Sequence, residues 1–200
     1  MTHVDSSRTI PIVGASPFAL ADRFELVERV KRSQRLPPRG LFRVVVADVR
    51  GRARPRHSHT LLFSSLLAAP LYHELIAAHY TLPAPHKHGP FNIAELTPAD
   101  YVPIAADAFA RRVRQHLDYR RYGCAPIAPE RRRNVTDYVD SLAAGGTATE
   151  IYALAPCEWF SAPGNAAHPH EWSHALLEFR EYVIFDTLAR TLTCLVFAFD

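Results

Sequence analysis

Apolar positions along this chain fall into short blocks with two different periods, and the clearest block is extended. Residues 41–49, Leu-Phe-Arg-Val-Val-Val-Ala-Asp-Val, are rich in β-branched side chains and apolar enough for burial on both faces, which predicts a core strand. Upstream, Ser16 and Pro17 form the N-cap and first-turn proline of a predicted helix that ends near Gln34. The residues that share one face of this helix are Leu20, Phe24, Val27 and Lys31.

The middle of the chain has further helical stretches. Residues 58–69 and 71–80 predict two short helices, which are broken at Pro70. A loop is expected over residues 83–90, and residues 97–119 predict a longer helix. Its apolar face is formed by Tyr101, Ala105, Ala108, Phe109 and Val113.

The last third of the chain is predicted to be mainly extended. A loop over residues 123–133 and a helix over residues 134–144 lead to Gly145-Gly146, a typical helix stop. Extended structure is then expected in three segments. These are a strand over residues 147–155, a hairpin over residues 174–186 with its tight turn at Arg180-Glu181, and a strand near residues 192–199.

These elements predict an α+β fold with a helical N-terminal part and a small antiparallel sheet towards the C-terminus. The hydrophobic content of 48% suffices for one substantial core, so we expect a single domain over residues 16–200 after a disordered or extended stretch over residues 1–15. No apolar run reaches the roughly 18–20 residues of a membrane helix, and the first residues lack the layout of a signal peptide. We therefore expect a cytoplasmic protein without membrane contact.

A histidine and an aspartate frame the predicted hairpin. Its turn would bring Asp186, at the end of the second strand, beside His174, at the start of the first. An aspartate that orients a histidine allows the imidazole to deprotonate a thiol. The two residues are therefore the candidate general base and orienting carboxylate of a cysteine-nucleophile enzyme.

The order of elements in this region resembles the papain-like and transglutaminase-like superfamily. The residues that carry the resemblance lie in the last third of the chain and are Gly145-Gly146-Thr147, Ser173-His174-Ala175-Leu176 and Val183-Ile184-Phe185-Asp186-Thr187. The resemblance implies acyl transfer from a glutamine or peptide carbonyl, or its hydrolysis or deamidation, through a thioester. It also implies a protein or peptide substrate and no cofactor.

The nucleophile is where the chain departs from that superfamily. The expected place, at the start of a helix whose dipole helps to ionise a thiol, is held by Arg133-Asn134-Val135. Three cysteines are too few and of the wrong parity for a disulfide scaffold, so free thiols are expected. Cys124 is the provisional nucleophile and Cys157 the alternative, whereas Cys194 lies in an apolar strand and is expected in the core.

A zinc site is a competing interpretation of the same region. The segment from His170 through Glu171 to His174 matches the HExxH motif and resembles the zincins. On a helix the two imidazoles would share one face and could ligate zinc, with Glu171 activating a metal-bound water. Residues 170–182 cannot be helix and strand at once, so the zinc and thiol interpretations exclude each other. The candidates for a third ligand of a catalytic zinc are Glu178, Glu181 and Asp186.

A structural metal is a further alternative, and its ligands would be His168, His170 and His174, with Cys157. His86 and His88 are expected to be exposed loop residues that bind no metal.

Charge supports a hypothesis from another class, a non-catalytic interaction protein. The net charge is +3, but residues 1–133 hold 21 Lys and Arg against 11 Asp and Glu, whereas residues 134–200 hold 2 against 9. The Arg-rich part would bind an acidic partner or nucleic acid, or the two parts would complement each other within one fold. A thiol within hydrogen-bonding reach of His174 separates the enzyme from the binding protein.

Overall fold

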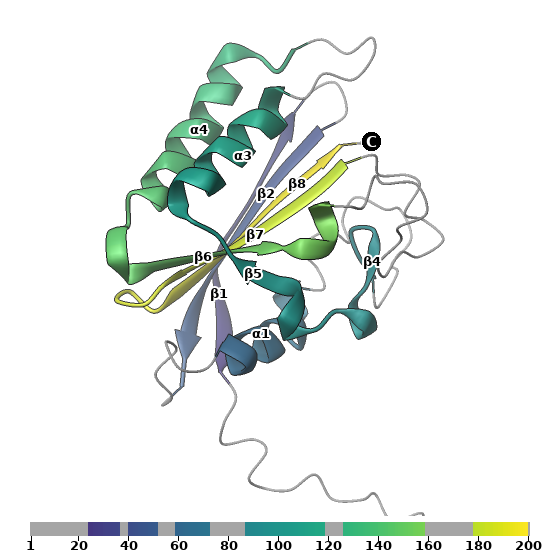
Figure 1. Cartoon of the computed structure of the whole chain (residues 1–200), viewed down its shortest axis with the longest axis vertical. Coiled ribbons are helices and arrows are strands. Elements are labelled where there is room, and N and C mark those ends of the chain that lie inside the picture. Colours follow the sequence, from purple (N-terminus) through teal and green to yellow (C-terminus); the bar gives the residue numbers. More distant parts are fainter. Residues whose placement is uncertain are drawn as a thin grey trace, which may run out of the picture.

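A six-stranded antiparallel sheet forms the centre of the protein (Figure 1). The computed structural model describes residues 24–36, 40–51, 59–72, 87–118, 126–158 and 178–199. In spatial order the strands are β1 (Glu25–Leu36), β2 (Gly40–Arg50), β8 (Thr191–Phe199), β7 (Glu178–Asp186), β6 (Thr149–Leu154) and β5 (Tyr101–Pro103). The sheet therefore combines strands from both ends of the described chain.

This arrangement corrects the predicted fold class. Helices and strands are both present, but the sheet is neither small nor confined to the C-terminal part, because β1 and β2 belong to it. The predicted helix up to Gln34 is wrong from Glu25 onward, where β1 pairs with β2. β2 is buried on both faces, so its backbone groups need a strand on either side, and β1 and β8 supply them. Pairing has overridden a local helical pattern.

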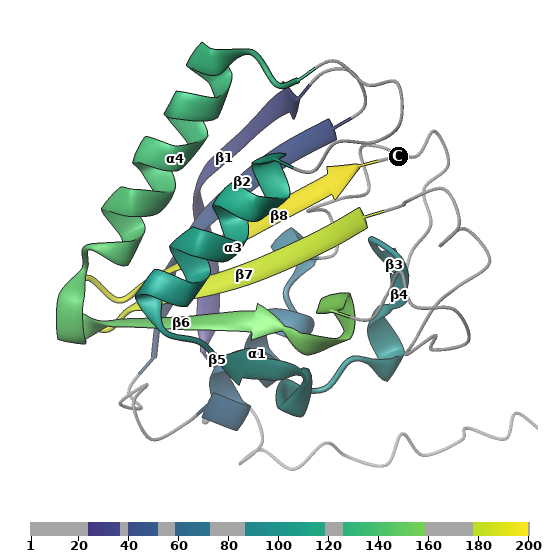
Figure 2. The same cartoon turned by 45° about the horizontal axis from the view of Figure 1, so that its top comes forward.

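Two helices cover one face of the sheet, α3 (Ala106–Asp118) and α4 (Pro129–Ala143), as Figure 2 shows. α3 begins later than predicted, because Pro98–Asp100 forms a 3₁₀ turn (η3) and β5 follows it. α4 begins earlier than predicted, with Pro129 in its first turn, so the predicted loop is wrong there. The buried residues of this layer include Phe109 and Val113 of α3, Val135 and Val139 of α4, and Phe42, Val44, Ile184 and Phe197 of the sheet.

The other face carries α1 (His59–Leu67) and a small hairpin of β3 (Lys87–His88) and β4 (Phe91–Asn92). α1 confirms the first of the two predicted short helices, of which the second lies largely outside the described residues. The hairpin turn contains Gly89 with φ +57°, and its backbone lies against the ring of Phe179. Three short 3₁₀ helices complete the described elements, namely η2 (Ile93–Glu95), η4 (Gly146–Ala148) and η5 (Ala155–Glu158).

β7 and β8 form the hairpin at the C-terminal end. β7 continues through Arg180 and Glu181, so the predicted tight turn there is wrong, and the real turn follows Asp186. The carboxylate Oδ1 of Asp186 accepts hydrogen bonds from the backbone N–H groups of Leu188 (2.9 Å) and Ala189 (2.8 Å), which shapes this turn. The predicted strands near residues 147–155 and 192–199 are confirmed as β6 and β8. Within the described ranges, no helix has the length and apolar character needed to cross a membrane.

Candidate functional site

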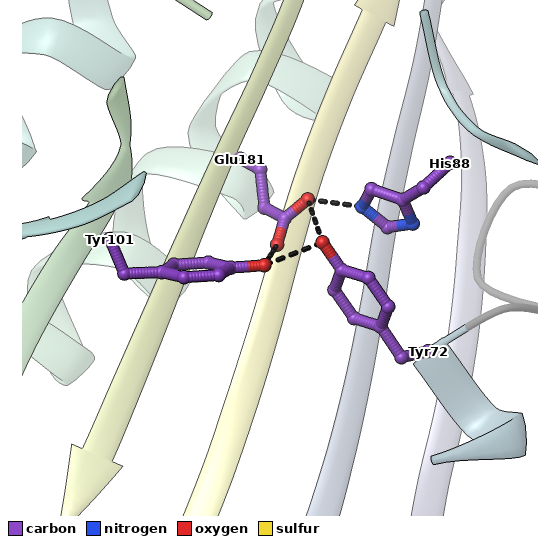
Figure 3. A network of polar contacts seen from close by, with 4 residues as sticks. All are labelled: Tyr72, His88, Tyr101 and Glu181. Atoms are coloured by element: carbon purple, nitrogen blue, oxygen red, sulfur yellow. Dashed lines mark hydrogen bonds and ion pairs between the residues drawn. The ribbon is translucent and has the colours of Figure 1, made fainter. Parts of the chain in front are cut away.

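The candidate site is built around Glu181, in the layer between the sheet and the β3–β4 hairpin (Figure 3). Side chains alternate along β7, so Glu181 lies on the same side as Phe179, Val183 and Phe185, which belong to the core of this layer. Only 1% of Glu181 is exposed. A carboxylate at such a position is costly unless partners satisfy it.

Three side chains converge on the Glu181 carboxylate, and none of them is appreciably exposed. The Tyr101 hydroxyl donates to Oε1 at 3.0 Å, and His88 Nε2 lies in hydrogen-bonding contact with Oε2. The Tyr72 hydroxyl lies 2.5 Å from the Tyr101 hydroxyl and 3.4 Å from Oε2. With Glu181 ionised, Tyr101 donates to Oε1, Tyr72 to the Tyr101 oxygen, and the His88 N–H to Oε2, so every donor has an acceptor.

Local packing holds each of these partners in place. Tyr72 lies in a helical turn shortly after α1, where its N–H donates to the carbonyl of Ala69 at 3.0 Å. Its ring stacks on His88 of β3 with centroids 3.8 Å apart. Tyr101 begins β5 and stacks on Phe63 of α1 at 4.1 Å. Four separate elements therefore meet at one carboxylate.

Burial, followed by the negative charge of Glu181, raises the pKa of both Tyr72 and Tyr101 well above that of free tyrosine. Both hydroxyls consequently stay protonated at neutral pH and act as hydrogen-bond donors. Arg43 of β2 lies on the same side of the sheet, since both Arg43 and Glu181 pair with Val196. Burial lowers the pKa of Arg43.

The second ring nitrogen of His88 has no such partner. Nδ1 is buried and makes no hydrogen bond in the described part of the structure, although the side chain is completely inaccessible to solvent. When Nε2 carries the proton that Glu181 accepts, Nδ1 is an unprotonated nitrogen with a lone pair. An imidazole held in this tautomer can accept a proton, react as a nucleophile or bind a cation.

Comparison with protein-family models, with curated proteins and with solved structures finds no match for this chain.

Most of the residues predicted for catalysis lie outside the described ranges. These are Cys124 and His174 of the thiol hypothesis and His170, Glu171 and His174 of the zinc hypothesis. His168, a candidate ligand of a structural metal, and His86, expected to be an exposed loop residue, also lie outside the described residues. Asp186 is described, and it shapes the β7–β8 turn. The turn that would have brought it to His174 is absent, because β7 runs straight from Glu178 to Asp186. Because Cys124 and His174 lie outside the described residues, their arrangement with Asp186 stays a prediction.

The two described cysteines are free thiols buried in the core. Cys194 is a core residue, as its apolar strand predicted, and burial and then the charge of Glu181 raise the pKa of its thiol well above the usual value. It is therefore a poor nucleophile at neutral pH. Cys157 is 1% exposed and its carbonyl accepts a hydrogen bond from Arg180. Among the described residues, no group of three or more His, Cys, Asp or Glu side chains is placed to hold a metal ion.

A second histidine–glutamate pair lies on the opposite face of β7. His116 of α3 contacts Glu178, with Nδ1 and Oε1 2.8 Å apart, and Arg180 lies 3.4 Å from the same carboxylate oxygen. Burial alone would raise the pKa of Glu178, but His116 and Arg180 outweigh it and the pKa is lowered. The His116–Glu178 pair joins the start of β7 to α3, whereas Glu181 joins β7 to the layer that contains α1 and the β3–β4 hairpin.

Arginines on α3 and α4 have acidic neighbours. Arg114 binds both carboxylate oxygens of Asp140, at 2.5 and 2.7 Å, and Arg132 is paired with Asp118. These exposed pairs reduce the positive charge that a nucleic acid would meet on the two helices. Binding of an acidic partner or nucleic acid stays a prediction.

Sequence reasoning missed the site because His88 was expected to be an exposed loop residue and Glu181 part of a turn. His88 lies in β3 and is fully buried, so that expectation is wrong. One signal was present: Glu181 interrupts an alternating apolar series with Phe179, Val183 and Phe185. A carboxylate on the apolar side of a strand indicates a buried polar site.

Proposed function

We propose that this protein is an enzyme that works by general acid–base catalysis, with His88 as the proton acceptor and Glu181 as the residue that positions it. One observation carries the proposal: the ring is fixed through Nε2, while the buried Nδ1 has no partner in the described residues. An unsatisfied buried polar atom costs about 1–3 kcal/mol. A catalytic role is one of the recognised reasons for which a native protein retains such an atom.

The arrangement fits a hydrolysis or group-transfer reaction. Nδ1 takes the proton from an attacking hydroxyl, thiol or water, and the resulting imidazolium is stabilised by the Glu181 carboxylate. The imidazolium then returns that proton to the leaving group, so the protons balance over the cycle. Tyr101 holds the carboxylate in one orientation throughout, and Tyr72 supports Tyr101 through the bond between their hydroxyls.

Cysteine-dependent acyl transfer stays a prediction beside this proposal. It requires Cys124 to be activated by His174, and iodoacetamide labelling tests this directly. Labelling of Cys124 below pH 7 that slows in His174→Ala would support it. The zinc peptidase prediction requires stoichiometric bound metal that is lost in His170→Ala.

Diethyl pyrocarbonate provides a test that needs no substrate, because it acylates an imidazole nitrogen that has a free lone pair. The His88 side chain is fully buried in this structure, so catalysis requires an opening of the layer over the sheet that exposes Nδ1. If His88 is the catalytic base, this opening serves the reaction, and we expect His88 to react much faster than His116. His116 is a matched control because it is also buried, is also paired with a glutamate, and also has a buried ring nitrogen, Nε2, that makes no hydrogen bond among the described residues. The modified residue is identified by mass spectrometry of peptides after brief exposure.

Glu181→Gln supplies the second arm of the test. Without an ionised acceptor the ring proton is no longer confined to Nε2, so we expect slower acylation of His88 and unchanged acylation of His116. Circular dichroism on the same sample establishes that the variant is folded. Acylation of His88 in the native protein that is no faster than that of His116 would show a purely structural pair and overturn the proposal.

A further inference from the structure

β1 is the outermost strand of the sheet, and its outer edge has no strand partner in the described part of the chain. The strand is twelve residues long and contains neither glycine nor proline. At the opposite edge β5 has only three residues and ends at Pro103. Long edges with unpaired N–H and C=O groups are templates for pairing with another chain. This edge, the β1 edge (Glu25–Leu36), is therefore the longer of the two outer edges of the sheet.

Charge is divided along the β1 edge. The first part carries Glu25, Glu28 and Arg29, and Arg29 lies 3.9 Å from Asp48 of β2, which offsets its charge. The charged residues of the second part are all basic, namely Lys31, Arg32 and Arg35. The side chains of Glu25, Glu28, Lys31 and Arg32 are exposed. A uniformly acidic peptide would be repelled by the first part, and a uniformly basic peptide by the second. The complementary partner is a strand whose charges run in the opposite order, which a second copy of β1 provides when it lies antiparallel.

We propose that two copies of this chain associate through their β1 edges, antiparallel about a two-fold axis, to form one continuous sheet. The axis places the acidic part of each strand against the basic part of the other, so each favourable contact occurs twice. Opposite charges facing each other across neighbouring strands are stabilising, and like charges are destabilising. The pairing of β1 with β2 shifts in register between Glu28 and Val30. Such a bulge distorts the edge strand and weakens its pairing with another chain. We therefore expect a dimer that dissociates on dilution.

Sedimentation velocity across a concentration series tests the proposal. The wild-type protein should shift from monomer to dimer with rising concentration, and added salt should move this transition to higher concentration because the contacts are ionic. A wild-type protein that stays monomeric throughout the series would overturn the proposal. This measurement involves no substitution and no part of the buried Glu181 site.

Charge reversal identifies the surface. Glu25→Lys with Glu28→Lys makes the edge uniformly basic, and Lys31→Glu with Arg32→Glu makes it predominantly acidic, with four glutamates against Arg29 and Arg35. Each variant alone should therefore be monomeric where the wild type is dimeric. An equimolar mixture of the two variants should form a dimer. Association of either variant alone as strong as that of the wild type would place the interface elsewhere.

The matched control changes charge away from the edge. Arg111→Glu with Arg133→Glu, at exposed positions of α3 and α4, alters the net charge as much as the Lys31 and Arg32 reversal does. It should leave the dimer intact. Loss of the dimer in this control as well would assign the effect to net charge and contradict pairing through β1.

Discussion

Removal of either tyrosine hydroxyl should destabilise the protein, and Tyr101→Phe should cost more than Tyr72→Phe. The Tyr101 hydroxyl donates to the Glu181 carboxylate at 3.0 Å and also contacts the Tyr72 hydroxyl at 2.5 Å. A hydrogen bond to a charged group contributes about 1.5–3 kcal/mol. We therefore expect Tyr101→Phe to lower the free energy of unfolding by about 2 kcal/mol, although Tyr72 can redirect its proton to Oε2 at 3.4 Å.

Tyr72→Phe leaves the bond from Tyr101 to Glu181 in place and removes mainly a bond between two neutral hydroxyls, which contributes about 0.5–1.5 kcal/mol. Urea unfolding followed by circular dichroism measures both costs, provided that the slope with urea is unchanged. The double variant should lose less than the sum of the two, because they share one bond. A Tyr72→Phe cost that equals or exceeds the Tyr101→Phe cost would refute this assignment of protons.

Three further predictions concern the frame of the site. Gly89 has φ +57°, and Gly89→Ala would place a Cβ 2.4 Å from the Phe179 ring. Gly146 has a similar φ of +66°, but a Cβ added there meets no atom within 4 Å, so Gly89→Ala should destabilise the protein more than Gly146→Ala. The melting temperatures of the two variants measure this difference. The pKa of Glu178 is lower in the folded protein than in the unfolded chain. The ionised Glu178 carboxylate therefore stabilises the fold fully above the unfolded pKa of about 4.3, and this stabilisation is lost as the pH falls through the pKa of the folded protein. Glu178→Gln should flatten the acid limb of stability against pH, and an unchanged limb would contradict this. Asp186→Ala should lose the two turn hydrogen bonds, at about 0.5–1.5 kcal/mol each, without altering cysteine labelling.

The strands that sequence reasoning predicted correctly contain their own signal. β2 and β8 are apolar enough for both faces to be buried, and this is visible without knowledge of their neighbours. β1 carries no such signal. Phe24, Val27 and Lys31 fit one face of a helix, and only the need of β2 for a pairing partner makes the segment extended. Element type was predictable where burial is complete and unpredictable at the edge of the sheet.

The candidate site was largely hidden for a related reason. Its four side chains come from elements that are distant in sequence, and no local spacing indicates that Tyr72, His88, Tyr101 and Glu181 meet. His88 follows a stretch with the composition of a loop, and its burial depends on how β3 folds over the sheet. Only Glu181 could have been recognised, once β7 is taken as a strand whose inward side is otherwise apolar.

The pairing of β2 with β8 governs when this protein can fold. Gly40 lies opposite Phe199 and Asp48 opposite Thr191, and the chain between these strands contains every described element except β1. A nascent chain therefore carries β2 with one edge unpaired until residues 191–199 have been synthesised. Contacts this distant in sequence slow folding, and an apolar strand that waits for its partner is exposed to aggregation and to chaperones. The sheet should therefore close only after residues 191–199 have emerged from the ribosome.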